Sequence, residues 1–264
     1  MPYVQEFKKR GAKFYIVILL ILKRVFILGI ICVGLVYAGL SNRPAEHASF
    51  YSFIENPSTD GIGKIYMGRE IASPIDGHEA IEWLERNDRE ETERIDLVLQ
   101  ALDLKKTDHL ADVGAGSGYI TFRLAPLVAE GKVYAVEISQ VMLKAMVDQK
   151  RRTKTKNVFP VLGTVESVQL PSKSVNVALM VDAYHEFSHP REMMESIVKA
   201  LKPGGKVVLV EYRGEDPAIP IKPLHKMTQT QIKKEMAAVG LAWEETRGFL
   251  PSQHFIVFKK IPTL

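Results

Sequence analysis

Cysteine is almost absent from the sequence. Its 264 residues include a single one, Cys32, which lies inside an apolar run. One cysteine excludes a disulfide framework within the chain, and it excludes metal or metalloid sites built from several thiolates. No internal repeat or low-complexity segment is present either. The length of 264 residues and the hydrophobic content of 46% predict one sizeable α/β core. We predict no metal site.

Most of the chain also lacks an excess of positive charge, although the formal net charge of the whole chain is +4. Residues 1–43 carry seven lysines and arginines and one acid, whereas the other 221 residues carry 28 basic and 30 acidic side chains. Proteins that bind duplex or single-stranded nucleic acid need a cationic surface. The sequence therefore predicts no nucleic-acid partner.

A long apolar run lies near the start of the chain, where residues 14–40 are apolar except for Lys23 and Arg24. A membrane-spanning helix needs about 20 such residues, and the strongly apolar positions offset two cations near one end. We interpret residues 1–43 as an uncleaved membrane anchor. A cleavable signal segment, with Val36–Ala38 as the small-residue site, is the alternative. By the positive-inside rule, the basic residues before the run predict a cytoplasmic N-terminus with the remaining chain outside. A segment that lies in the membrane without crossing it is the other possibility, so the side of the domain stays open.

The segment His109–Ile120, HLADVGAGSGYI, carries glycine at every second position of its centre. An apolar run precedes the glycines, and apolar residues recur at helical spacing after them. The pattern predicts a strand, a tight turn and a helix, with backbone N–H groups facing a ligand. A dinucleotide fingerprint needs glycine where Tyr119 stands, and the lysine of a phosphate-binding loop is absent. What remains is D-x-G-x-G-x-G, from Asp112 to Gly118.

Acids end two further predicted strands. Lys132–Ser139 predicts a strand ending at Glu137, 23 positions after Gly114. That distance is close to the roughly 20-residue spacing of a ribose-binding acid in such folds. Val175–Phe187 predicts an apolar strand that stops at Asp182. Both acids are therefore expected at the carboxyl edge of a parallel sheet, beside the glycine turn.

The glycine motif, the two acids and an LKPGG turn at 201–205 together resemble the class I S-adenosylmethionine-dependent methyltransferases over residues 108–260. The resemblance implies a doubly wound, Rossmann-like α/β fold: a seven-stranded sheet with helices on both faces and an antiparallel last strand. It implies S-adenosyl-L-methionine as the cofactor. Many relatives have an acid after the third strand; Thr164 stands at that place here, and we assign the role to Glu166. The cofactor-binding residues implied are Asp112, Gly114, Ala115, Gly116, Gly118, Glu137, Ile138, Glu166 and Asp182.

Methyl transfer needs a base only where the acceptor must lose a proton. His185, three residues after Asp182, is the candidate catalytic base. Ligands bind at the carboxyl ends of strands in such sheets, and histidine titrates near neutral pH. The alternative is a histidine that only caps the next helix or bonds to Glu186. Side chains predicted to line the acceptor pocket are Tyr184, Glu211, Arg213 and His225.

The predicted organisation has three parts: residues 1–43 as the membrane anchor, 44–107 as a linker and helical lid, and 108–264 as the methyltransferase domain. Within the second part, residues 76–104 have the spacing of one or two helices. They are interpreted either as a packing helix with a charged side or as a lid over the cofactor pocket.

The sequence thus predicts a membrane-associated methyltransferase acting on a small or lipophilic acceptor, such as a quinone-like molecule or a lipid head group. One alternative is a non-catalytic, S-adenosylmethionine-binding membrane scaffold. The other is a nicotinamide-dependent oxidoreductase, which the misplaced third glycine disfavours. The predicted topology conflicts with a cofactor that is made inside cells. Neither the acceptor nor the oligomeric state follows from the sequence.

Overall fold

The computed structural model describes residues 50–75 and 77–261. The chain divides into two compact units, Met1–Phe50 and Tyr51–Leu264, and the elements below belong to the second. The predicted membrane anchor, residues 1–43, lies outside the described residues. Within the described ranges, no helix is both long and apolar enough to cross a membrane.

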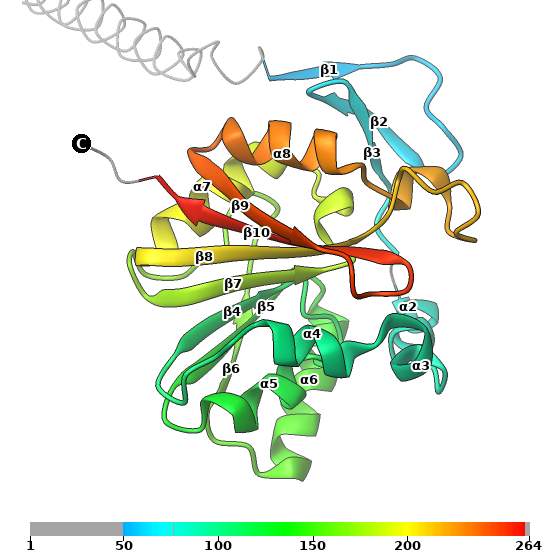
Figure 1. Ribbon diagram of the computed structural model, residues 1–264. Helices are drawn as coiled ribbons and strands as arrows, with labels where there is room; N and C mark the ends of the chain where they lie inside the picture. The colour runs from blue at the N-terminus through cyan, green and yellow to red at the C-terminus, as the bar shows by residue number, and fades with distance from the viewer. Residues whose placement is uncertain (1–49, 76, 262–264) are drawn as a thin grey trace, which may run out of the picture. The chain divides into compact units, whose positions relative to one another are not determined.

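A mixed sheet forms the centre of the second unit (Figure 1). Its seven strands are β4 (His109–Val113), β5 (Lys132–Glu137), β6 (Val158–Leu162), β7 (Val175–Val181), β8 (Leu201–Tyr212), β9 (Leu241–Arg247) and β10 (Gln253–Lys260). They lie in the order β6-β5-β4-β7-β8-β10-β9. Pairing is parallel from β6 to β8, whereas β10 is antiparallel to both of its neighbours. The predicted Rossmann-like sheet with an antiparallel last strand is confirmed.

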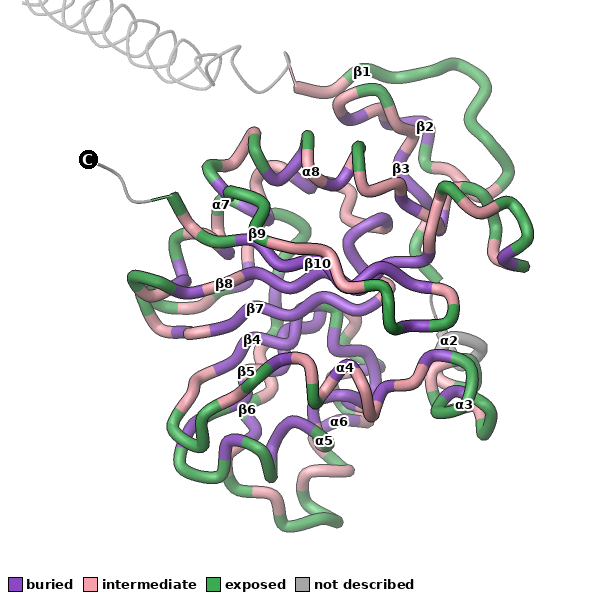
Figure 2. Tube along the Cα trace, viewed as in Figure 1, coloured by how far each residue is buried: buried purple, intermediate pink, exposed green. Residues whose placement is uncertain are grey.

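Helices cover both faces of this sheet. They are α4 (Ile95–Ala101), α5 (Thr121–Leu124), α6 (Gln140–Thr153), α7 (Pro190–Ala200) and α8 (Gln229–Ala237). One hydrophobic core lies between the sheet and helices α7 and α8, and it includes Ile197 and Val207. A second core lies between the sheet and helices α4 and α5, and it includes Val98 and Val208. Successive side chains of β8 enter opposite cores, as a strand requires. Figure 2 shows the buried residues concentrated on the strands between these layers.

A second, three-stranded antiparallel sheet occupies part of the predicted linker. Its strands are β1 (Tyr51–Phe53), β2 (Gly61–Tyr66) and β3 (Arg69–Ala72). Met67 and Gly68 join β2 to β3 with φ of 49° and 98°, the left-handed pair of a tight hairpin. A methionine rarely adopts that conformation, so the sequence carried no turn signal here. Arg69 Nε lies 2.6 Å from Glu235 Oε1 and ties this sheet to α8.

Two short helices precede α4: α2 (Gly77–Leu84) and α3 (Arg89–Glu93). They lie in the segment predicted to be a packing helix or a lid. A buried ion pair holds α3, with Arg89 Nε 2.9 Å from Glu93 Oε2. Arg89 also donates from Nη1 to the Leu84 carbonyl at 2.7 Å. One guanidinium therefore fixes both the end of α2 and the turn of α3.

Candidate active site

The glycine turn lies between β4 and α5, at the carboxyl edge of the main sheet. The backbone N–H groups of Gly114 and Ala115 donate to the Val136 carbonyl at 3.0 and 3.1 Å. The N–H of Gly116 donates to Glu137 Oε2 at 2.8 Å. Parallel register between β4 and β5 brings these groups together. The turn and the acid that ends β5 are therefore one unit, as their spacing in the sequence predicted.

Gly116 shows why this turn needs glycine. Its φ is +56°, in the left-handed region that side chains disfavour. A Cβ atom added there would lie 2.6 Å from Leu84 Cδ1, in the last turn of α2. The Leu84 side chain therefore lies directly over the turn and has to shift for any larger residue at this position.

Glu137 accepts hydrogen bonds from three backbone donors. Besides the bond from Gly116, its Oε1 accepts from the N–H groups of Ile138 and Ser139 at 2.7 and 2.8 Å. The side chain is 9% exposed. These bonds fix both carboxylate oxygens at the sheet edge, where a carboxylate is suited to accept hydroxyl groups of a ribose.

Asp112, at the end of β4, is almost completely buried and accepts a hydrogen bond from Thr121 Oγ1 at 2.5 Å. Burial raises the pKa of the Asp112 carboxyl to about 6, although the Thr121 bond and the Arg89 charge both lower it. An acid whose pKa lies near neutrality responds strongly to a ligand that brings a positive charge. Asp112 is such a group, buried beside the glycine turn.

A cavity of about 20 Å³ lies against the turn, lined among others by Leu84, Arg89, Asp112 and Gly114. That volume holds about one water molecule. The two helical residues, Leu84 and Arg89, close the space in front of the turn. A nucleoside-sized cofactor needs more room, so we expect α2 and α3 to move away when one binds.

Asp182 follows β7 and has a φ of +48°, a strained conformation for an aspartate. Its Oδ2 accepts a hydrogen bond from Gln253 Nε2 at 2.7 Å, whereas its buried Oδ1 has no hydrogen-bond partner within the described part of the chain. Burial raises the pKa of Asp182 well above its usual value, and the Glu93 and Glu211 carboxylates add to the rise. Unpartnered buried acceptors are rare, and this one fits a ligand donor.

Two further residues predicted to bind the cofactor, Ile138 and Glu166, are exposed. Ile138 is 50% exposed and follows Glu137 directly, so it offers an apolar surface at the edge of the sheet. The side chain of Glu166 is 61% exposed, and its Oε1 lies 4.0 Å from His189 Nε2. Its backbone N–H donates to Thr164 Oγ1 at 3.3 Å. The role assigned to Glu166 remains a prediction.

His185 lies in the short helix η3 (Tyr184–Glu186), directly after β7. Its Nδ1 is 2.6 Å from Glu211 Oε2, and its Nε2 is 3.2 Å from Nδ1 of His225, in η4 (Pro223–His225). Burial opposes the charged form of His185, but the Glu211 carboxylate outweighs it and raises the pKa of His185. The structure therefore brings three sequence-predicted residues, His185, Glu211 and His225, into one buried group.

The side chains of two predicted acceptor-side residues form other contacts. The hydroxyl of Tyr184 donates to Glu235 Oε2 at 2.7 Å, within the core beneath α8. Arg213 donates to the backbone carbonyls of Leu250 and Gln253 at 3.1 and 3.2 Å, and so holds the loop between β9 and β10. Both contacts are structural, and neither residue shares a hydrogen bond with His185 or His225 among the described residues.

Some residues at the site were absent from the sequence prediction. Arg69 donates to the His185 carbonyl at 3.1 Å, across 116 positions of the chain, and no local pattern marks such a contact. Gln253 reaches Asp182 from the last strand in the same way. Arg89 and Glu93 are different, because their i,i+4 spacing on a helix was a visible signal of an ion pair.

Comparisons with known proteins agree with this geometry. Residues 111–209 match the family model for a methyltransferase domain. The chain is 27% identical over 124 residues to the uncharacterized methyltransferase YdaC of Bacillus subtilis, covering 47% of this chain and 67% of that protein. It is 27% identical over 105 residues to the ubiquinone/menaquinone biosynthesis C-methyltransferase UbiE of Wigglesworthia glossinidia brevipalpis, covering 39% and 42%.

A solved structure shares the fold. A SAM-dependent methyltransferase from Aquifex aeolicus superposes with a TM-score of 0.67 at 20% identity, covering 71% of this chain and all of that one. At this identity the likeness shows the fold alone. Together with the match over residues 111–209 and the relatives, it supports a class I S-adenosylmethionine-dependent methyltransferase whose cofactor is S-adenosyl-L-methionine.

Proposed function

We propose that this protein transfers a methyl group from S-adenosylmethionine to a small or lipophilic acceptor while anchored to a membrane. The observation that carries the proposal is the joined turn and acid: the Gly116 N–H bonded to the Glu137 carboxylate, with Asp112 buried beside them. This arrangement of main-chain donors and two acids suits a cationic nucleoside. No phosphate-binding loop competes with that interpretation.

The residues at the sheet edge fit the cofactor group by group. Asp112, buried beside the turn, would bind the ammonium of the cofactor's amino acid once α2 and α3 have moved. The unpartnered Asp182 Oδ1 and Ser117 Oγ offer buried polar atoms to the same ligand. Glu137 would accept the ribose hydroxyls.

When bound, S-adenosylmethionine supplies a methyl group already activated by the positive sulfur. The chain's own residues have to orient the acceptor, exclude water and hold any proton that is released. The buried group around His185 is suited to hold that proton. Its Nδ1 side is bonded to Glu211 at 2.6 Å, which stabilises the charged imidazole.

Two features favour a lipophilic acceptor at a membrane. The chain outside residues 1–43 has no excess of basic side chains, which argues against a polyanionic acceptor. The name of the UbiE relative assigns it to ubiquinone and menaquinone biosynthesis, so the similarity extends to an enzyme of quinone methylation. The apolar run at 14–40 supplies the proposed anchor.

The anchor has its own test. The full-length chain should stay with membranes after carbonate washing and keep its N-terminal segment. Replacing Ile30 and Val33 with aspartate should release it, because each carboxylate inside a span costs several kcal/mol, about 2.5–3.5 on insertion scales. A mature N-terminus near Gly39 would show cleavage instead and refute the anchor.

The function is tested by acceptor profiling. The full-length chain is incubated with S-adenosylmethionine and a panel of quinols, phenols and lipid extracts, and methylated products are identified by mass spectrometry. The His185→Asn variant should lose turnover by about 10²–10⁴-fold, with its affinity for S-adenosylhomocysteine unchanged. His109→Asn, at the start of β4 and so at the opposite edge of the sheet, is the control. Binding without any product would favour the scaffold alternative.

A further inference from the structure

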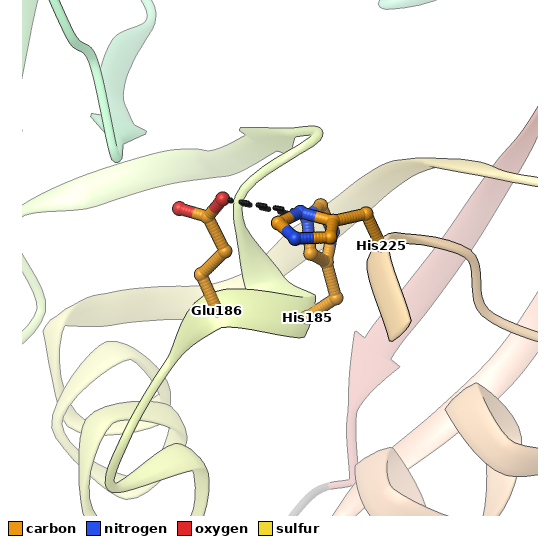
Figure 3. A group of neighbouring side chains, drawn as sticks. All are labelled: His185, Glu186 and His225. Carbon is orange, nitrogen blue, oxygen red and sulfur yellow. Dashed lines mark hydrogen bonds and ion pairs between the residues drawn. The ribbon is translucent and has the colours of Figure 1, made fainter. Parts of the chain in front are cut away.

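Three potential metal ligands point toward one another at the carboxyl edge of the sheet (Figure 3). His185 and Glu186 come from η3, and His225 comes from η4, 40 positions further along the chain. Their facing atoms are His185 Nε2, Glu186 Oε1 and His225 Nδ1. Both histidines are buried, and the Glu186 side chain is 20% exposed.

The separations of these atoms match a tetrahedral metal site. The two imidazole nitrogens are 3.2 Å apart, and Glu186 Oε1 lies 3.4 Å from His225 Nδ1 and 3.7 Å from His185 Nε2. Ligands about 2.0–2.1 Å from a tetrahedral Zn²⁺ are about 3.3–3.4 Å apart. An octahedral ion with similar bond lengths places neighbouring ligands only about 3.0 Å apart. We infer that His185, Glu186 and His225 bind a divalent transition-metal ion, with Zn²⁺ the best match.

A second set of contacts orients these ligands. Glu211 Oε2 lies 2.6 Å from His185 Nδ1, which leaves the lone pair of Nε2 free for a metal. Glu211 is itself fixed by the Tyr184 N–H at 2.9 Å. A carboxylate that holds the far nitrogen of a histidine ligand is the usual support of a zinc site. The backbone N–H of Ile75 bonds to Glu186 Oε1 at 3.3 Å and orients the third ligand.

The local charge also favours a cation. Two carboxylates, Glu186 and Glu211, lie next to two histidines in a largely buried place. Arg69 contacts the His185 carbonyl, but Glu235, 2.6 Å away, already balances its charge. A divalent ion bound at His185 Nε2 would take the place of the proton on that nitrogen and balance both carboxylates.

Three protein ligands leave one tetrahedral position open, which is the pattern of catalytic rather than structural zinc. Resting on the proposed methyl transfer, the open position would take the acceptor's oxygen and favour its deprotonated form, with the proton released to solvent water. His185 would then serve as a ligand, and the metal, rather than the imidazole, would prepare the acceptor. The proposal that these three residues bind a metal ion does not depend on its role in methyl transfer.

Metal binding is tested without the methyl donor. The untagged full-length chain, stripped with a chelator, is titrated with ZnCl2 by calorimetry, and bound zinc is counted by elemental mass spectrometry. One ion should bind per chain. The variants Glu186→Gln and His225→Asn should weaken binding at least about 100-fold, and Glu211→Gln about 10–100-fold. His109→Asn should bind as the wild type, because His109 begins β4 and so lies at the opposite edge of the sheet from the cluster.

A folding control accompanies the titration. Glu186→Gln should melt at about the temperature of the wild type, because Glu186 is partly exposed and its replacement leaves the histidine pair in place. Substituted Co²⁺ should show a four-coordinate visible spectrum. No zinc uptake, uptake that Glu186→Gln and His225→Asn leave unchanged, or a six-coordinate spectrum would overturn the inference and leave a metal-free histidine pair. Zinc binding by a protein that methylates no acceptor would refute the proposed function alone.

Discussion

The two halves of the carboxyl edge hold their functional acids in different ways. Around β4 and β5, Glu137 is bound by three main-chain N–H groups. Around β7 and β8, Glu211 is bound by one main-chain N–H and by the His185 side chain. Strand register fixes the positions of main-chain donors, whereas the positions of side-chain partners depend on the conformation of each loop. The cofactor half is therefore built into the fold, and the histidine half is an addition to it.

The largest expected effect comes from filling the glycine turn. In Gly116→Val, the new side chain meets Leu84 and forces valine into a left-handed conformation. We expect the affinity for S-adenosylhomocysteine to fall more than about 100-fold by calorimetry, since a shifted turn loses several contacts at once. Gly240→Val is the matched control: its φ is +77°, and an added Cβ meets no atom within 4 Å. Equal losses in both variants would contradict the role of Gly116.

Removing the acid of the cofactor half should have the next largest effect. Glu137→Ala leaves up to three backbone donors without an acceptor, each costing about 1–3 kcal/mol where it stays buried. We expect a lower melting temperature and about 10–100-fold weaker binding of S-adenosylhomocysteine. Glu166→Ala, at an exposed position, should change the melting temperature little. If the two variants melt and bind alike, Glu137 does not organise this edge.

The pH dependence of cofactor binding should follow Asp112. Its pKa is raised to about 6 in the folded protein, so the protonated form is favoured, and its ionisation disfavours the fold as pH rises from about 4 to 6. A cationic ligand beside it favours the ionised form. The affinity for S-adenosylmethionine should therefore rise with pH up to about 6, by at most tenfold per pH unit, and level off above it.

Calorimetry from pH 5 to pH 7.5 measures this dependence. Asp112→Asn cannot ionise, so its affinity should be lower and nearly constant over the same range. A wild-type affinity that falls as pH rises, or a variant that keeps the full dependence, would assign the titration to another group.

The smallest effect is expected at α2. Leu84→Ala removes the side chain that lies over Gly116 and makes the movement of α2 easier. Because that movement lowers the apparent affinity for the cofactor, the variant should bind S-adenosylhomocysteine about 2–5-fold more tightly. Trp83→Ala, at an exposed position on the same helix, is the control. Weaker binding by Leu84→Ala would show that Leu84 contacts the cofactor rather than excluding it.

The arrangement around β4 and β5, which we propose holds the cofactor, was predictable because its signals are local. Asp112, the glycines and Glu137 lie within 26 positions, and strand pairing carries that spacing directly into space. The antiparallel last strand was implied by the family resemblance instead. The position of Glu137 beside the glycine turn needed only strand register and turn chemistry.

The histidine half was only partly predictable. His185, Glu211 and His225 were each singled out, but no short spacing marks them as one cluster, and the sequence predicted no metal site. Arg69 reaches this cluster from a hairpin whose Met-Gly turn carries no usual signal. Such contacts depend on loop conformations, which local pattern does not specify.

The most direct test of the central claim compares two ligands on the unmodified, full-length chain. S-adenosylhomocysteine and NAD are titrated separately by calorimetry under the same conditions. The arrangement of the glycine turn, Asp112 and Glu137 predicts saturable binding of one S-adenosylhomocysteine per chain and no binding of NAD. Binding of NAD with no response to S-adenosylhomocysteine would contradict the assignment of this edge to a methyl donor.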